Sequence, residues 1–227
     1  MKRRVLITGG TGFVGSWMKA VQPDKITAHY IGKQAYEEMN WKLSNYDYIV
    51  HLANVNPGKV LVNNLRAKIL YCSSGAAYDQ DTEYAKNKRK WEQMCEGMNV
   101  VIARPFTFYG RGLDPNKAIS QFINNAEHNE PIVIHGTGKA IRSYMDAGLM
   151  GTILWTILFD GKVGEIYDVG DTTPITMLQL AEIIRDQHNP NLEIIVENGI
   201  DSVPCYIPKN MKKTWALMLE MESRYNR

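Results

Sequence analysis

The sequence predicts an α/β protein built on a doubly wound parallel sheet, with a small C-terminal substrate-binding lobe. Three observations predict this class. Short aliphatic and β-branched runs alternate with helical patterns over the first half of the chain. A glycine-rich turn at residues 9–15 joins the first run to the first helical pattern. Beyond residue 105 the elements shorten, and one later strand-like run, at 165–169, is expected to rejoin the sheet.

Six strand-like runs lie at 4–8, 25–30, 48–52, 68–73, 99–104 and 165–169. Helical patterns separate most of them, at 12–21, 57–67, 83–98 and 178–187, and residues 150–159 form an apolar helix. Parallel strands need crossover connections of this kind. Short runs at 132–135 and 193–196 are expected outside the main sheet. Between Tyr30 and Tyr48 there is room for a short helix at 34–38 and at most a stub of strand at 39–42.

This order of elements also predicts the domain organisation. Residues 1–105 and 165–171 are expected to form a dinucleotide-binding domain. Residues 106–164 and 172–227 are expected to form the substrate-binding lobe. The 227 residues are enough for a large buried core.

Composition excludes several classes of function. The 26 Lys and Arg residues against 24 Asp and Glu give a net charge of only +2, which argues against bulk binding of nucleic acid or a membrane surface. No apolar run is long enough to span a bilayer, and no signal peptide is evident. The cysteines, Cys72, Cys95 and Cys205, are expected to be reduced core thiols, not a disulfide framework or a metal site. We therefore expect a cytoplasmic protein.

The strongest motif is the segment from Val5 to Gly15, VLITGGTGFVG. Three glycines follow the first strand at three-residue spacing, and a helical pattern follows them. Gly9 should allow the tight turn, Gly12 should let a pyrophosphate approach the backbone, and Gly15 should let the helix pack on the strand. Free backbone N–H groups and the positive end of the helix dipole would face the phosphates. The segment predicts a dinucleotide site of the Rossmann type.

A second cluster predicts proton-transfer chemistry. Ser74 follows the fourth strand, and Tyr84 and Lys88 stand four residues apart on the next helix, so they share a face. A lysine ammonium beside a phenol favours the phenolate, and Lys88 is therefore expected to lower the pKa of Tyr84 from its usual value of about 10. Such a tyrosine can take a proton from a sugar hydroxyl while the carbon gives a hydride to a nicotinamide, with Ser74 holding the same oxygen.

Seven ordered segments resemble the extended short-chain dehydrogenases/reductases, the NAD-dependent epimerase/dehydratase group that acts on nucleotide sugars. They are TGGTGFVG from residue 8, DYIVHLAN from 47, LYCSSGAAY from 70, YAKNK from 84, RPFTFYGRG from 104, GTGKAIRSYM from 136 and GEIYDVGDTTPIT from 164. The resemblance runs over almost the whole chain. It implies a Rossmann fold, a nicotinamide cofactor (NAD), a nucleotide-sugar substrate and a homodimer.

The resemblance also implies roles for individual residues. Ser74, Tyr84 and Lys88 would be the catalytic set, and Lys88 would also bond the nicotinamide ribose. Ser74, Thr107 and Arg142 would contact substrate, with the planar Arg142 guanidinium on its phosphates; Thr107 stands where the family usually carries Asn. The residues implied to bind cofactor are Gly9, Thr11, Gly12, Phe13, Val14, Gly15, Leu52, Ala53, Asn54, Tyr84, Lys88 and Pro105. Phe106 would also lie near the nicotinamide.

Two departures from the family affect the expected cofactor and substrate contacts. The second strand does not end in the usual acidic residue that binds the adenosine ribose, and Lys33 follows instead, which leaves NADP open beside NAD. The usual Asp after Arg142 is lost unless Asp146 replaces it.

A third departure bears on the reaction. Ser74 is followed by Gly75-Ala-Ala, whereas dehydratases of the group carry an Asp-Glu pair there and decarboxylases a Glu. Unless Asp79, Asp81 or Glu83 reaches back, elimination lacks its acid and base. Hydride transfer at a sugar hydroxyl carbon, C4 by the resemblance, fits better. The sequence therefore predicts an NAD(P)-dependent nucleotide-sugar epimerase or ketoreductase. The alternative is a catalytically weak NAD(P)-binding sensor or scaffold protein of the same fold.

Overall fold

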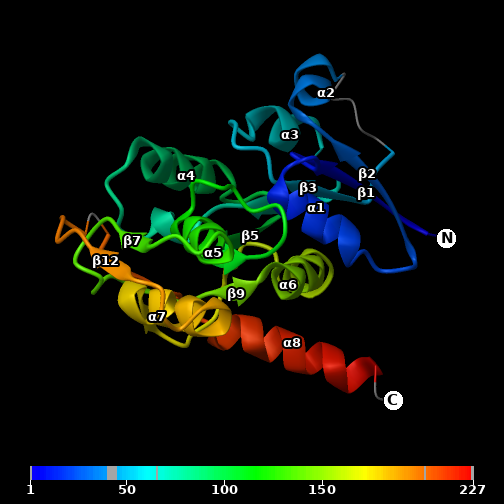
Figure 1. Cartoon of the computed structure of the whole chain (residues 1–227). Helices are drawn as coiled ribbons and strands as arrows, with labels where there is room; N and C mark the ends of the chain where they lie inside the picture. Colours follow the sequence, from blue (N-terminus) through cyan, green and yellow to red (C-terminus); the bar gives the residue numbers. More distant parts are fainter. Residues whose placement is uncertain (1, 40–44, 65, 202, 226–227) are drawn as a thin grey trace.

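The computed structural model describes residues 2–39, 45–64, 66–201 and 203–225. Its centre is a six-stranded parallel sheet in the order β2-β1-β3-β4-β5-β10 (Figure 1). The strands are Arg3–Thr8 (β1), Ile26–Ile31 (β2), Tyr48–His51 (β3), Lys68–Cys72 (β4), Val100–Pro105 (β5) and Ile166–Val169 (β10). This confirms the predicted doubly wound sheet, including the late strand that returns to its edge.

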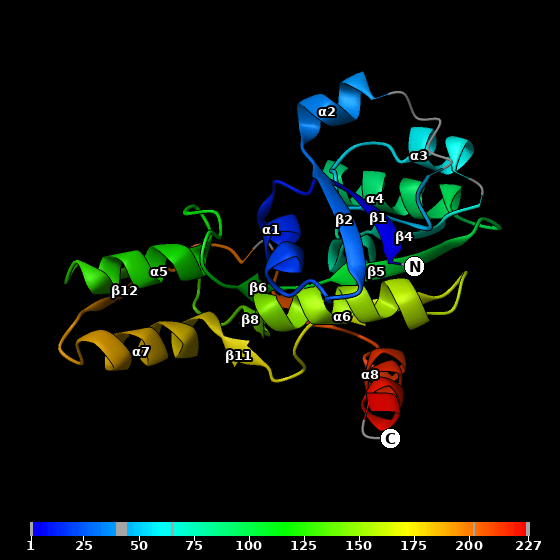
Figure 2. The same ribbon diagram turned by 90° about the vertical axis from the view of Figure 1, so that its right-hand side faces the viewer.

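Helices cover both faces of the sheet, as Figure 2 shows. Side chains alternate along a strand, so Val5 and Ile7 enter one core cluster while Leu6 enters the other. The first cluster includes residues of Phe13–Ala20 (α1) and Ala147–Asp160 (α6), on which Lys212–Tyr225 (α8) packs. The second is closed by Lys33–Glu38 (α2), Gly58–Asn63 (α3) and Glu83–Met94 (α4).

Helix α6 belongs to the core of the sheet. Its buried residues run almost without interruption from Met150 to Leu158, as expected of a helix buried on most of its surface. The indole of Trp155 donates a hydrogen bond to the carbonyl oxygen of Met18 on α1 at 2.8 Å. The sequence grouped residues 106–164 with the substrate-binding lobe; that division of the chain stays a prediction, and α6 itself packs on the central sheet.

The remaining elements form a second group beside the sheet. Ile132–Ile134 (β7) and Ile194–Val196 (β12) pair in parallel outside the main sheet, as predicted, and pack with Ala118–Glu127 (α5) and Met177–His188 (α7) in a third core cluster. Nearer the sheet, Ile141–Arg142 (β8) lies between Ile175–Thr176 (β11) and Cys205–Tyr206 (β13). Phe108–Tyr109 (β6) pairs with Met145–Asp146 (β9). The sequence did not predict α5 or α8.

Some predicted helices end early. The pattern at 83–98 predicted four more residues than α4 has; the chain turns at Gly97, whose φ of +73° cannot continue a helix. The pattern at 57–67 becomes the six-residue α3, and the Asn64 side chain turns back to donate to the carbonyl oxygen of Val60 at 2.9 Å. The stub of strand expected at 39–42 lies mostly outside the described residues. Among the helices that are described, none has the length and apolar character to cross a membrane.

Candidate active site

The candidate active site is a cavity of about 820 Å³ at the carboxyl ends of the central strands. Doubly wound sheets bind their ligands at that edge, next to the point where strand order reverses; here the reversal falls between β1 and β3. Nine of the expected site residues line the cavity: Val14, Leu52, Asn54, Ser74, Tyr84, Lys88, Pro105, Thr107 and Arg142. The structure thus gathers the expected cofactor, catalytic and substrate residues around one space.

In the glycine turn between β1 and α1, a Cβ would be less crowded at Gly12 than at Gly9 or Gly15. Gly9 adopts φ +69°, and a Cβ there would lie 2.7 Å from the backbone nitrogen of Ala53. A Cβ on Gly15 would lie 2.5 Å from the backbone of Gly10. At Gly12 an added Cβ would meet only the carbonyl oxygen of Gly9, at 3.3 Å. Gly12 is also exposed, so a phosphate could approach the backbone there, as a dinucleotide site requires.

Six other expected cofactor residues do not line the cavity: Gly9, Thr11, Gly12, Phe13, Gly15 and Ala53. Phe13 stacks on Phe108, with ring centroids 5.4 Å apart, and so fixes the start of α1 against β6. Val14, the next residue, faces the cavity.

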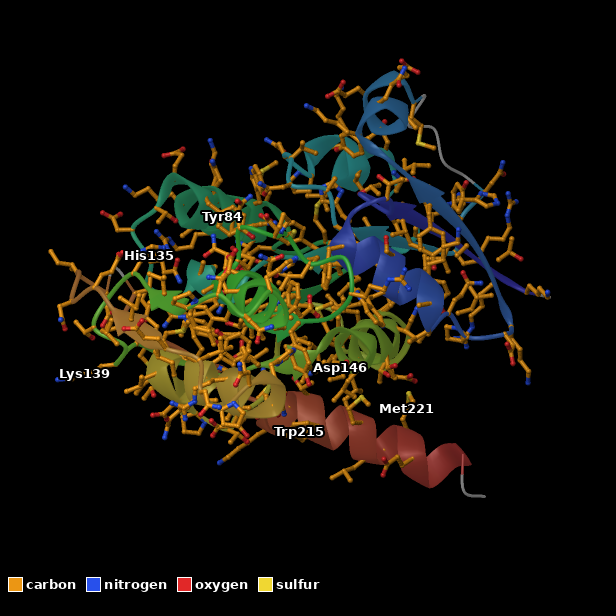
Figure 3. The ribbon with its side chains drawn as sticks, in the orientation of Figure 1. Tyr84, His135, Lys139, Asp146, Trp215 and Met221 are labelled. Carbon is orange, nitrogen blue, oxygen red and sulfur yellow. The ribbon has the colours of Figure 1, made fainter. Side chains whose placement is uncertain are left out.

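The expected catalytic residues come from two adjoining elements. Ser74 lies two residues after β4 and caps the short 3-10 turn Gly75–Ala77, with its Oγ accepting from the backbone nitrogen of Ala76 at 3.2 Å. Thr82 caps α4 and places Tyr84 and Lys88 in its first two turns. Tyr84 is 43% exposed and lies at the start of α4, where it is labelled in Figure 3. The phenol is therefore open to a ligand in the cavity.

Lys88 is buried next to the Tyr84 ring and hydrogen-bonded to the backbone. Its side chain is only 3% exposed, and its ammonium donates to the carbonyl oxygen of Cys72 at 3.1 Å. The ammonium also lies 5.4 to 5.5 Å from the ring centroids of Tyr71, Tyr84 and Trp91, which can stabilise the cation. Burial lowers the pKa of Lys88, while Cys72 and Glu92 act in the opposite direction.

The sequence expectation for the pKa of Tyr84 is wrong for this structure. Lys88 was expected to lower that pKa. Instead burial raises it, because removing a phenolate from water costs more than removing a neutral phenol. A hydrogen bond with Ser74 lowers the pKa, and Lys88 makes no resolved contribution. The group that favours the Tyr84 phenolate here is the serine hydroxyl.

A buried ion pair lies next to Ser73, the neighbour of Ser74 in the chain. The carboxylate of Glu92, one turn after Lys88 on α4, accepts hydrogen bonds from Arg104 Nε at 2.9 Å and from Ser73 Oγ at 2.5 Å. Arg104 also places its guanidinium 4.3 Å from the ring centroid of Tyr78. The pair joins α4, β4 and β5 and so fixes the helix that carries Tyr84 relative to the strand that precedes Ser74.

Tyr206 is the residue of this site that sequence reasoning missed. It lies on β13, lines the cavity, and its hydroxyl is 3.2 Å from Ser74 Oγ. The two residues are separated by 132 positions in the chain. Tyr206 follows an ordinary loop sequence, and only the pairing of β13 with β8 brings it to the site; no motif around it could have indicated this.

The wall opposite the sheet carries Arg142. Its guanidinium donates to the carbonyl oxygen of its neighbour Ile141 at 2.8 Å. Asp201, which also lines the cavity, accepts hydrogen bonds from the backbone nitrogen and the hydroxyl of Thr137. Asp146 is not a substitute for the missing acidic residue of this segment, because it caps α6 by accepting from the backbone nitrogens of the next turn at 2.8 and 3.0 Å.

The acidic residues after Ser74 are engaged elsewhere. Asp79 accepts from the Lys209 ammonium at 2.6 Å, and Asp81 pairs with Lys86 at 2.9 Å. Glu83 accepts from the side chain of Asn87 at 3.3 Å. Between Ser74 and Tyr84 the cavity is lined by Ala76 and Gln80, and neither carries a carboxylate.

Two further expectations can be compared with the structure. Cys72 and Cys95 are buried free thiols, as predicted, but Cys205 is exposed, so its assignment to the core was wrong. Cys205 lies on the two-residue strand β13, at the edge of the small sheet, outside the hydrophobic core. Lys33 begins α2 with an exposed side chain whose ammonium lies 4.0 Å from Glu37.

Comparison with known proteins agrees with this geometry. The sequence profile of the NAD dependent epimerase/dehydratase family matches residues 61–170. The dTDP-D-glucose 4,6-dehydratase of Bos taurus is 39% identical over 114 residues, which are 50% of this chain and 32% of that protein. The mouse protein of the same name is 25% identical, with 88% of this chain and 78% of that protein covered. In the bovine and human alignments the chain spans about a third of the relative's length.

Solved structures share the fold at low sequence identity. The UDP-glucuronic acid 4-epimerase from Bacillus cereus in complex with NAD superimposes with a TM-score of 0.79 at 17% identity, covering 95% of this chain and 92% of that one. The UDP-N-acetylglucosamine 4-epimerase from Bacillus cereus gives 0.74 at 19% identity, covering 97% and 96%. Fold and site define a Rossmann-type protein of the extended short-chain dehydrogenase/reductase class. The chain is similar to the NAD dependent epimerase/dehydratase family over residues 61–170, and its fold is that of the solved epimerase and dehydratase structures.

Proposed function

We propose that this protein is a nicotinamide-dependent nucleotide-sugar epimerase or ketoreductase that acts at a sugar hydroxyl carbon, C4 by family resemblance. The observation that carries the proposal is the grouping of Ser74, Tyr84 and Lys88 at one end of a cavity that also holds Arg142. The family is NAD dependent by description, and structural relatives hold NAD. The exposed backbone at Gly12 fits the pyrophosphate of such a cofactor.

The chain's own residues supply the proton chemistry. The Tyr84 phenolate takes the proton of the sugar hydroxyl, and Ser74 holds the same oxygen by hydrogen bond. Lys88, fixed by the Cys72 carbonyl, can bond the nicotinamide ribose. A bound nicotinamide would supply the hydride chemistry at the sugar carbon. Arg142 holds the substrate phosphates on the opposite wall.

Elimination of water is less well supported than hydride transfer alone. The curated sequence relatives include proteins named as dehydratases. In this chain Ala76 lines the wall after Ser74, and Asp79 and Asp81 are paired with lysines. A group that could donate a proton to a leaving hydroxide is therefore missing from the place after the serine. This favours an epimerase or a ketoreductase.

The variant Tyr84→Phe tests the proposal. We expect NAD binding by calorimetry to be retained, and turnover in a panel of UDP-, dTDP-, GDP- and CDP-sugars to fall by about 10²- to 10⁴-fold. Tyr46→Phe, which removes a phenol paired with His29 at the sheet edge, is the matched control and should turn over normally. Unchanged turnover in Tyr84→Phe would refute the assigned role.

A second candidate is a binding protein with little catalysis. The end of β2 favours it, since Gly32 and the exposed Lys33 stand where an acidic residue would hold the adenosine ribose. Titration with NAD and NADP, followed by the same sugar panel, separates the two. Tight cofactor binding without turnover of any sugar would replace the enzyme by the binding protein.

The homodimer implied by the family resemblance is part of this proposal. In this chain α3 and α4 present only a small apolar surface for such a dimer. α3 has only six residues, and the exposed residues of α4 include Glu83, Lys86 and Lys90. Light scattering over a range of protein concentrations measures the oligomeric state. A constant monomer mass would contradict the dimer.

A further inference from the structure

We propose that this protein forms a two-fold symmetric dimer through the outer face of α8, on which the same helix of a second copy packs in antiparallel orientation. The inference rests on the homodimer of the proposed function and gives that homodimer a surface other than α3 and α4. Four exposed residues of α8 define the surface, which we call the α8 seam: Lys212, Trp215, Leu219 and Glu222.

The inner face of α8 is occupied by this chain itself. Thr214 is fully buried, and its hydroxyl donates to the carbonyl oxygen of Asp168 at 2.6 Å. Leu217 is buried in the first core cluster, and the Met221 sulfur accepts from the Thr156 hydroxyl on α6 at 3.2 Å. Figures 1 and 2 show α8 lying on the outside of α6. The seam residues lie on another side of the helix, which is open to solvent.

The spacing of the seam residues is that of a helix that faces a partner helix. They recur at intervals of three, four and three residues, as in the contact positions of a coiled coil. Trp215 is 39% exposed and Leu219 is 65% exposed, although both side chains are large and apolar. Single exposed apolar residues are ordinary, but these two lie one turn apart on the same stripe. The stripe therefore offers a continuous apolar centre to a neighbour.

The charges at the two ends of the seam indicate that the neighbour is a second copy. Lys212 begins α8, Glu222 lies near its end, and no ion pair among the described residues includes either of them. The helix dipole favours the opposite order, with acidic residues at the start and basic residues at the end. Within one copy the order of charges is therefore unfavourable. An antiparallel copy compensates for it, because each Lys212 then lies beside the partner's Glu222.

The seam is complementary to itself in one register. A two-fold axis beside residue 217 pairs Lys212 with the partner's Glu222, and symmetry repeats the contact in reverse. The same axis pairs Trp215 with the partner's Leu219, so the apolar and the charged contacts form together. The seam is only about 15 Å long, by the rise of a helix, which is short for a stable interface. We therefore expect a weak dimer, with a Kd on the order of 1 to 100 μM.

The experiment reverses the charges of the seam in the full chain, and sedimentation velocity measures the Kd of the dimer. Lys212→Glu places a carboxylate beside the partner's Glu222 at both ends of the seam, so we expect the Kd to rise by at least about tenfold. Glu222→Lys should have the same effect. The double variant Lys212→Glu/Glu222→Lys restores opposite charges in the same register and should return the Kd to within about threefold of wild type.

Two further variants complete the test. Lys25→Glu makes the same change of net charge as Lys212→Glu, but at an exposed lysine beside β2, on the other edge of the sheet, and should leave the Kd unchanged. Leu219→Ser changes no charge and removes apolar contact at both symmetry-related places. It should weaken the dimer by at least about tenfold, and it replaces the charge variants if one of them does not fold.

Each result decides for or against the seam. A dimer with wild-type Kd in Lys212→Glu, Glu222→Lys or Leu219→Ser overturns the inference and leaves α3 and α4 as the surface of the homodimer. A double variant that dimerises no better than the single variants also overturns it. A wild-type protein that stays monomeric up to about 300 μM does the same and leaves the exposed face to a different partner. None of these results depends on turnover, whereas full turnover in Tyr84→Phe would refute the proposed reaction alone.

Discussion

The carboxylate of Asp168 accepts a hydrogen bond from the hydroxyl of Tyr78 at 3.0 Å, which ties the returning strand β10 to the end of the turn that begins at Ser74. The second oxygen of the same carboxylate accepts from the backbone nitrogens of Lys209 and Asn210, at 2.9 and 2.8 Å. Asp168 is only 1% exposed. One buried carboxylate thus fastens both the segment before Tyr84 and the segment after Tyr206.

Replacing Asp168 by Ala should therefore loosen the site as well as the fold. We expect the free energy of unfolding to fall by about 2 to 4 kcal/mol, because buried donors lose a charged acceptor. Asp168→Asn is the matched control, since its amide can accept from the backbone and donate to Tyr78; it should recover most of the loss. Urea unfolding measures both variants, and equal losses in the two would contradict this account.

His51 predicts a pH dependence of stability. It is fully buried, with its ring nitrogens bonded to Thr8 Oγ1 at 2.8 Å and to the Val55 carbonyl oxygen at 3.1 Å. Burial, assisted by the charge of Lys88 and opposed by the Val55 bond, lowers the pKa of His51 from 6.5 to about 4. The unfolded chain therefore binds a proton at a pH where the folded protein does not.

This difference in proton binding makes the folded protein less stable as the pH falls. The contribution of neutral His51 is complete above pH 6.5 and is lost as the pH falls from 6.5 towards about 4. The loss amounts to about 3 kcal/mol, by the usual conversion of a pKa difference into free energy. Urea unfolding between these pH values measures it. His51→Gln should remove this part of the slope, while His128→Gln, on the surface after α5, should keep it; a slope retained in His51→Gln would contradict the assignment.

Two glycines of the first turn should give opposite results when changed to alanine. Gly15→Ala drives a methyl group into the backbone of Gly10, 2.5 Å away, and should lower the free energy of unfolding by about 2 kcal/mol. Gly12→Ala places its methyl 3.3 Å from the Gly9 carbonyl oxygen and should cost less stability than Gly15→Ala, yet weaken NAD binding by at least about tenfold, since the methyl would block the approach of a phosphate to the backbone. Thermal unfolding and calorimetry measure the two effects. Equal NAD affinity in Gly12→Ala and wild type would place the pyrophosphate elsewhere.

Lys88→Met should separate catalysis from stability. An apolar side chain replaces a buried ammonium, so the loss of the Cys72 hydrogen bond is offset by a smaller penalty for burial. We expect unfolding free energy within about 1 kcal/mol of wild type and turnover lower by about 10²- to 10⁴-fold. Lys90→Met, an exposed lysine on the same helix, should change neither. Normal turnover in Lys88→Met would remove this lysine from the catalytic set.

The central sheet could be predicted because short patterns along the chain indicate each of its strands. Each strand from Val5 to Val169 is a short apolar run, and the glycine turn marks the one place where strand meets helix over a phosphate site. Ser74, Tyr84 and Lys88 followed from spacing on two adjoining elements, and the structure brings them to one cavity. Their roles stay predictions until the variants are measured.

The rest depends on contacts that no local pattern records. Tyr206 reaches Ser74 only through the pairing of β13 with β8, and Asp168 fastens residues about forty positions further on. The pKa of Tyr84 went against expectation because burial of the phenol outweighs a lysine that faces its ring and donates to a backbone carbonyl. Spacing along a helix predicts that two side chains lie near each other, but which groups they hydrogen-bond depends on the other elements of the site.

Cys205 is a natural site for labelling the protein with a thiol reagent. Its thiol is exposed, whereas Cys72 and Cys95 are buried, and it directly precedes Tyr206 in the chain. A fluorescent maleimide should therefore attach at this single position without any engineered cysteine. The attached dye would sit next to the wall that faces Ser74, so its emission could report when a sugar nucleotide enters, even for a substrate that is never turned over.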